Sequence, residues 1–296
     1  MRVTFNALNR GLDAINRAAD QFMEAQYQVS TGKRLRTLST DPAASQRSVV
    51  ERSELANIDS YSQAGSAASS RLAALDQTLS DLVEQIQRAK VAASSGHPDT
   101  ASATTRAAAA VTLGGIRDSM AADINQELDG IHVFSGANSR TAAYARNGGG
   151  AWVYQGDAQA VQTEVDAGRK VTMTMDGQAI MQGSDTTDLL TTMDNLVTAV
   201  QNGDGAGINA GFDALERAFQ RVSRALSIVG TDEVSVSDSG AHLQKLQLAS
   251  EKRVSVLEDT NLAEAIVRMS RAQTAYNAAL GAVGTAGKNS LLNYLT

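Results

Sequence analysis

The stretch FNALNRGLDAINRAADQFMEAQYQV, residues 5–29, decides the fold that the sequence predicts. Its larger apolar side chains recur at alternating intervals of three and four residues, like the a and d positions of a coiled-coil heptad. This N-terminal seam consists of Phe5, Leu8, Leu12, Ile15, Ala19, Phe22 and Val29, with Gln26 as its polar member. We therefore expect an amphipathic helix that ends near Gly32, because glycine is suited to close a helix.

The C-terminal stretch LAEAIVRMSRAQTAYNAALGAV, residues 262–283, repeats this pattern. Its C-terminal seam consists of Leu262, Ile266, Met269, Tyr276, Leu280 and Val283, with Gln273 as its polar member. Three alanines at heptad spacing, Ala265, Ala272 and Ala279, flank the seam and would allow a second helix to approach closely. Isolated helices are marginal in water, so we expect the two to pair with each other or with neighbouring subunits. The larger apolar members of both seams, all except Ala19, form the predicted assembly interface.

Between the ends, further stripes at helical spacing predict more helices. Asp41-Pro42 reads as an N-cap and first-turn proline that open a long helix toward Gly96, with Leu72–Ala89 as its apolar stripe. Asp99 would cap a second helix that runs toward Asp129-Gly130. Three shorter helices are expected over residues 189–200, 208–229 and 243–257, the middle one ending at Gly230.

From residue 131 to about 181 the apolar period changes toward two, which is typical of strands. Strands are expected at residues 131–134, 152–154, 161–165 and 171–175. Ala167-Gly168 and Asp176-Gly177 read as turns, the second as a hairpin signal. These strands predict one small antiparallel β module inserted into a helical chain.

The predicted fold class is mainly α with a small β insert. We expect an elongated rod of long antiparallel helices, with the terminal coiled-coil helices at one end and the β module at the other. The expected parts are a terminal-helix domain (residues 1–40 and 259–296), a helical rod domain (residues 41–130 and 184–258) and a β-rich outer module (residues 131–183).

Composition excludes several classes of function. The chain has 296 residues, a net charge of −6, no cysteine and two prolines. A mildly acidic chain has no electrostatic reason to bind nucleic acid or an anionic membrane. Without cysteine there is no disulfide, thiol catalysis or zinc–thiolate site. The first residues lack the apolar run of a cleaved secretory signal, and no stretch is long and apolar enough to span a membrane.

No motif supports an enzyme. Residues 30–33, STGK, fit an S-x-x-K pattern without its companion motifs and read as a helix end with a basic loop. Residues 205–210 fit a dinucleotide-loop pattern but do not follow a strand, and residues 281–288 have the wrong spacing for a phosphate loop. We therefore predict no catalytic, cofactor-binding or metal site, and no small-molecule substrate.

Several blocks, taken together, resemble the bacterial flagellin superfamily over essentially the whole chain. The blocks are QVSTGKRL (residues 28–35), STDPAA (39–44), VFSG (133–136), YQGD (154–157), DTNLAEA (259–265), AQTAYNAAL (272–280) and SLLNYL (290–295). The opening Met1-Arg2-Val3-Thr4, the Pro42 position and the closing residues look more like the subunit that joins hook and filament than like flagellin. Flagellin, the self-polymerising filament subunit, and another kind of secreted coiled-coil structural protein remain alternatives.

The resemblance implies export through the flagellar type III apparatus and an extracellular place at the hook–filament junction. It implies a ring of copies of this chain between hook-associated protein 1 and flagellin. A cytosolic export chaperone would hold the C-terminal helix before secretion. The terminal helices would fold into a tubular bundle during assembly, which suits amphipathic helices that are marginal alone.

Overall fold

The structure, a computed structural model, describes residues 2–37 and 41–295, and its side chains over residues 9–37 and 41–285. The described part contains seven helices and six short strands. In chain order they are α1 (Arg2–Thr31), α2 (Pro42–Ser95), α3 (Ala103–Ile124), β1 (Glu127–Leu128), β2 (Ile131–His132), β3 (Tyr144–Arg146), β4 (Trp152–Tyr154), β5 (Gln162–Asp166), β6 (Arg169–Thr172), α4 (Gly177–Met181), α5 (Leu189–Asn202), α6 (Gly205–Glu258) and α7 (Leu262–Leu295). The expected fold class, mainly helical with a small β insert, is confirmed.

The chain divides into two compact units. The terminal unit contains residues 1–57 and 245–296, and the central unit contains residues 58–244. The helices α2 and α6 contribute residues to both units.

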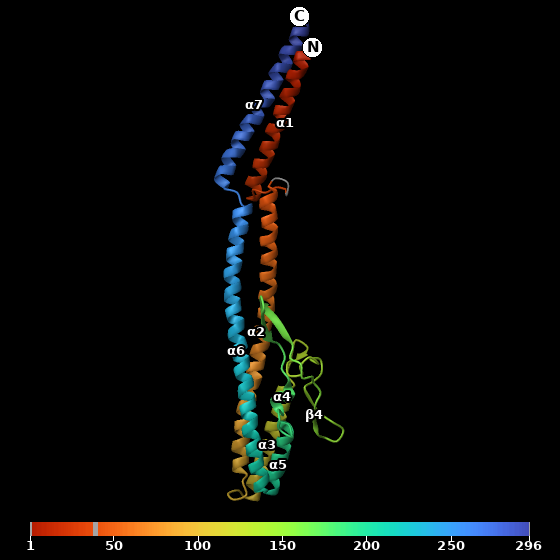
Figure 1. Cartoon of the computed structure of the whole chain (residues 1–296), viewed down its shortest axis with the longest axis vertical. Helices are drawn as coiled ribbons and strands as arrows, with labels where there is room; N and C mark the ends of the chain where they lie inside the picture. Colours follow the sequence, from red (N-terminus) through yellow and green to blue (C-terminus); the bar gives the residue numbers. More distant parts are fainter. Residues whose placement is uncertain (1, 38–40, 296) are drawn as a thin grey trace. The chain divides into compact units, whose positions relative to one another are not determined.

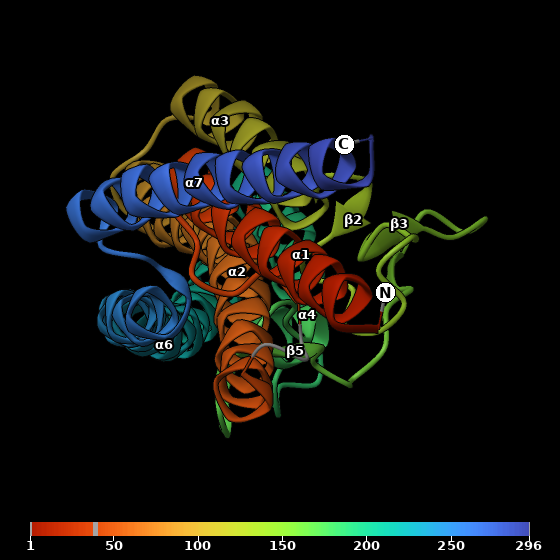
Figure 2. The ribbon, with the colours of Figure 1, turned by 90° about the horizontal axis from the view of Figure 1, so that it is seen from above.

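In the terminal unit, α1 and α7 lie side by side and run in opposite directions (Figures 1 and 2). Gly32 follows α1 with a φ of +71°, a left-handed conformation that glycine adopts without strain, so it closes the helix as expected. Asp41 caps α2, because its Oδ1 accepts a hydrogen bond of 3.0 Å from the backbone N–H of Ala44. Pro42 is the first residue of α2, as predicted.

In the central unit, α2, α3, α5 and α6 share one continuous hydrophobic core (Figure 1). The predicted α2 stripe is fully buried: Leu72, Leu75, Leu79, Leu82, Ile86 and Ala89. Burying one leucine or isoleucine side chain contributes about 1.5–3 kcal/mol. The stripe therefore fixes which face of α2 points into the core.

Several helix boundaries differ from the sequence expectation. Gly230 does not end a helix, since α6 continues from Gly205 to Glu258. A glycine inside a helix costs only about 1 kcal/mol, and the buried neighbour Val229 packs into the core, so packing outweighs the propensity. The cap of α3 is Ser102, whose side chain accepts from the N–H of Thr105, and not Asp99.

The expected single β module is three separate two-stranded antiparallel sheets, β1–β2, β3–β4 and β5–β6. The Ala167-Gly168 turn joins β5 and β6 as predicted. The Asp176-Gly177 hairpin is wrong, because Asp176 caps the short helix α4 through a 2.8 Å bond from Gln178 N–H. Asp129-Gly130, expected to end a helix, instead forms the β1–β2 turn, with φ of +53° and +78°.

Candidate assembly surface

Small side chains make the contact between α1 and α7. Ala18 and Ala25 of α1 are buried, as are Ala265 and Ala272 of α7. Nearer the chain ends, a Cβ placed on Gly11 would lie 2.7 Å from Cγ2 of Val283, so the two helices touch there. The expected close approach through alanines is therefore present. We call the small residues of this contact the small stripe: Gly11, Ala18, Ala25, Ala265 and Ala272.

Four of the larger side chains of the two predicted seams lie beside this contact and stay open to solvent. Leu12, Leu262, Ile266 and Leu280 are each between 43% and 50% exposed. A second group is half-buried: Ile15, Phe22, Val29, Met269, Tyr276 and Val283. The described members of both seams are therefore either exposed or half-buried on the paired helices.

Helix geometry explains this graded exposure. Ile15 follows Gly11 by four residues, as Met269 follows Ala265, which turns each of them about 40° from the small stripe. Leu12 and Ile266 follow the same two residues by one, which turns them about 100° away. The first pair is therefore partly covered by the neighbouring helix, whereas the second pair points past it.

The structure describes the side chains of ten of the twelve residues of the predicted interface. Phe5 and Leu8 lie outside the residues whose side chains are described. Met23 and Val267, which the heptad pattern did not include, are 47% and 48% exposed and widen the apolar surface. Each directly follows a seam residue, and a rule based on intervals of three and four cannot select adjacent positions.

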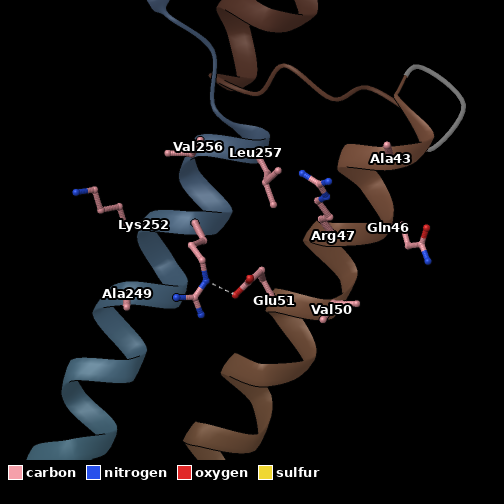
Figure 3. A pocket seen from close by; sticks show the side chains of 10 residues that line it. Ala43, Gln46, Arg47, Val50, Glu51, Ala249, Lys252, Val256 and Leu257 are labelled. Carbon is pink, nitrogen blue, oxygen red and sulfur yellow. Dashed lines mark ion pairs between the residues drawn. The ribbon is translucent and has the colours of Figure 1, made fainter.

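A groove of about 870 Å³ lies between the start of α2 and the end of α6, within the terminal unit (Figure 3). Val50, Val256 and Leu257 line it, and the first two are exposed. Arg253 of α6 forms an ion pair with Glu51 of α2, with its Nε 2.8 Å from Oε2 of Glu51. The groove is a second apolar surface in the unit that carries the two seams.

The segments that link the helices of the terminal unit are bonded to each other. They are residues 32–37 after α1 and residues 259–261 before α7, and we call them the connectors. The backbone N–H of Thr260 donates to the carbonyl oxygen of Gly32 at 2.9 Å, which closes an antiparallel bridge between Lys33 and Asp259. Lys33 Nζ lies 2.6 Å from Asp259 Oδ1, and this hydrogen bond raises the pKa of Lys33 and lowers that of Asp259.

Two of the motifs that were considered as enzyme or cofactor motifs, residues 30–33 and 205–210, form ordinary parts of the fold. Ser30 Oγ donates to the carbonyl oxygen of Tyr27 at 3.1 Å and Lys33 pairs with Asp259, so residues 30–33 are a helix end and a basic loop. Residues 205–210 form the first turns of α6. Among the described residues, no group of three His, Asp or Glu side chains is placed to hold a metal ion. Over the same residues, no helix combines the length and hydropathy needed to cross a membrane.

Comparison with known proteins shows which proteins the chain resembles. Residues 4–139 match the family model of the bacterial flagellin N-terminal helical region. A solved structure described as a flagellar hook-associated protein from Vibrio parahaemolyticus has the same fold, with a TM-score of 0.68 at 21% identity over 74% of this chain and 99% of that one. Residues 4–139 thus resemble the N-terminal helical region of bacterial flagellins, and the chain shares its fold with that solved structure.

The curated proteins that the chain matches are hook-associated proteins. The chain is 29% identical over 175 residues to flagellar hook-associated protein 3 of Escherichia coli, covering 58% of this chain and 53% of that protein. It is 28% identical over 182 residues to the protein of the same name from Salmonella typhimurium, covering 61% and 56%. The chain thus spans little more than half the length of the curated relatives that it matches.

Proposed function

We propose that this chain is a structural subunit of the bacterial flagellum that joins the hook to the flagellin filament. The observation that carries the proposal is the row of half-exposed, heptad-spaced apolar side chains on the paired helices α1 and α7. The similarity to hook-associated proteins supports the place in the flagellum. Its partners would be hook-associated protein 1, flagellin and further copies of itself in a ring.

In this proposal the helices α1 and α7 complete their burial only in the assembly. Full burial of a leucine or isoleucine contributes about 1.5–3 kcal/mol, and roughly half of that area is still open at Leu12, Leu262, Ile266 and Leu280. Each of them would add about 0.7–1.5 kcal/mol when a neighbour covers it. The terminal helices (residues 1–40 and 259–296) would line a tube, the rod domain (41–130 and 184–258) would surround them, and the β-rich module (131–183) would face outward.

Before assembly, the same apolar surface needs protection. We infer that a cytosolic export chaperone covers the exposed stripe of α7, including Ile266 and Leu280, and that the chain leaves the cell through the flagellar export apparatus. The exposed side chains support this, because contiguous apolar surface of this kind promotes aggregation when it is left uncovered.

The test is complementation of a motile bacterium that lacks its own hook–filament junction gene. The unaltered chain should restore swimming and attached filaments. Leu280→Asp should be secreted but should leave flagellin unattached in the medium, because it places an unpaired carboxylate in the new interface. Ala278→Asp is the matched control, since Ala278 is exposed and is turned about 160° from Leu280 on the same helix. If Leu280→Asp restores swimming as well as the control does, the seam is not the interface.

The filament subunit, flagellin, is the second candidate, because the matching family model is that of flagellin. A concentrated solution of the purified chain with a precipitant salt distinguishes the two by electron microscopy and sedimentation. Long regular filaments of this chain alone would assign it as flagellin. A chain that stays monomeric, with ends that a protease trims to a core near residues 41–259, would support the junction role.

A further inference from the structure

The last residue of α6, Glu258, is a buried carboxylate with an unusually complete set of partners. Its side chain is only 8% exposed. The guanidinium of Arg52 on α2 donates to both of its oxygens, from Nε at 2.7 Å and from Nη2 at 2.6 Å. Ser48 Oγ, one turn earlier on α2, donates to Oε1 as well. A two-pronged arginine–carboxylate pair of this kind fixes orientation as well as distance.

Glu258 and the next residue, Asp259, also contact the connector that follows α1. Lys33 Nζ lies 3.5 Å from Oε2 of Glu258, in addition to its 2.6 Å contact with Asp259. The backbone N–H of Arg34 donates to the carbonyl oxygen of Glu258 at 2.6 Å. One residue therefore contacts the start of α2 through its side chain and the connector after α1 through both its side chain and its backbone.

Arg34 extends the network to the cap of α2. Its Nη2 donates to the carbonyl oxygen of Leu257 at 3.0 Å, and its Nη1 lies 3.2 Å from Oδ2 of Asp41. The other oxygen of Asp41 caps the first turn of α2. Three cations (Lys33, Arg34 and Arg52) thus face three carboxylates (Asp41, Glu258 and Asp259), and we call these six residues with Ser48 the clasp.

We propose that Glu258 is the positioning residue of the terminal unit, which locks the two connectors onto α2 so that α1 and α7 meet a neighbouring subunit as one fixed surface. The neighbouring subunit in this inference rests on the proposed function, whereas the positioning of the connectors by Glu258 does not. Connectors of this length are ordinarily free to swing, because segments without regular structure are the mobile parts of a fold. The clasp restricts this motion where the first connector approaches α2 and where the second connector leaves α6.

The geometry also predicts an asymmetry between the partners. Glu258 is buried, whereas the Arg52 side chain is 61% exposed. Removing Arg52 leaves a buried charge with fewer partners, but removing the charge of Glu258 leaves an arginine that water can solvate. Glu258→Gln therefore tests positioning with little risk to folding, and Arg52→Lys keeps the charge while removing the two-pronged contact.

The experiment uses pulsed electron spin resonance on the full chain, whose lack of cysteine allows clean labelling. Spin labels on Met23→Cys in α1 and Val50→Cys in α2 report how α1 is held against α2, and both sites are exposed. We expect one narrow distance distribution, a broad one in Glu258→Gln and an intermediate one in Arg52→Lys. Hydrogen exchange at the amides of Arg34 and Thr260 should become about ten- to a hundredfold faster in Glu258→Gln, as expected when a bond to a charged group is lost.

Glu251→Gln is the matched control, since Glu251 is an exposed carboxylate two turns earlier on α6. The proposal is overturned if Glu258→Gln keeps the narrow distribution, if the control broadens it equally, or if the unaltered chain is already broad. Helicity measured by circular dichroism should stay constant, which separates positioning from unfolding. These measurements are made on the purified chain and do not require a flagellum. If the unaltered chain failed to complement, the proposed function would be wrong, but the proposed role of Glu258 would be unaffected.

Discussion

The contact between α1 and α7 predicts a specific cross-link. A Cβ built on Gly11 lies 3.9 Å from Cβ of Val283, and disulfides in proteins have Cβ separations of about 3.5–4.5 Å. The double variant Gly11→Cys, Val283→Cys should therefore form an intramolecular disulfide under mild oxidation. The natural chain has no cysteine, so no other thiol competes.

The bond would close a loop from residue 11 to residue 283. The chain-entropy model gives an upper limit of about 5–6 kcal/mol for a loop of this length. Replacing the half-buried valine costs about 1 kcal/mol. Oxidation should therefore protect the terminal helices against protease strongly, and adding a reductant should abolish that protection. Mass spectrometry measures the loss of two hydrogens, and non-reducing electrophoresis measures the fraction that is linked.

The control pairs Gly11→Cys with Asn277→Cys. Asn277 is exposed on the same helix, about 9 Å along the axis from Val283 and turned away from it by about 120°. This pair should link far more slowly. Equal rates for both pairs would show that α1 and α7 slide past each other, and the argument from a fixed small stripe would then fail.

Three further results are expected. Leu82→Ala, at a fully buried core position, should lower the free energy of unfolding of the central unit by about 2–5 kcal/mol in a denaturant titration. Gly136→Ala should destabilise the β-rich segment by about 1–3 kcal/mol, seen as faster hydrogen exchange there, because Gly136 has a φ of +60° and a Cβ would collide with the carbonyl oxygen of Asp157. Arg52, Ser48 and Lys33 lower the pKa of Glu258 from 4.5 to about 2, so the stabilisation from this carboxylate is complete above about pH 4.5 and is lost as the pH falls toward 2. The difference in unfolding free energy between the chain and Glu258→Gln should shrink over that interval, and a constant difference would contradict the pKa shift.

The sequence predicted the terminal helices because their periodicity is local. It did not decide which stripe of each terminal helix contacts the other terminal helix. Gly11, Ala18 and Ala25 recur every seven residues, as do Leu12 and Ala19, so spacing alone cannot rank the two stripes. The choice depends on how closely two backbones approach, which is a property of the pair of helices.

The two Asp-Gly signals were misleading for a related reason. Asp-Gly occurs at Asp129-Gly130, where it forms a hairpin, and at Asp176-Gly177, where it starts a helix. The dipeptide permits both outcomes, and the packing of the segments that follow decides between them. The clasp had no local signal at all, because Glu258 is 206 residues from Arg52.

The use of small side chains between α1 and α7 bears on how such a subunit could assemble. If the larger seams faced each other, the pair would bury more apolar area and be more stable, but little would remain for a partner. Pairing through glycine and alanine leaves Leu12, Ile266 and Leu280 beside the contact and available. Under the proposed function the pair would be weaker, and the free energy of assembly would be correspondingly larger, because a neighbour would supply the missing burial. A weak pair also needs its orientation fixed by something other than its own core. The clasp at Glu258 lies where the two connectors meet α2, so it can fix that orientation without covering any of the apolar surface.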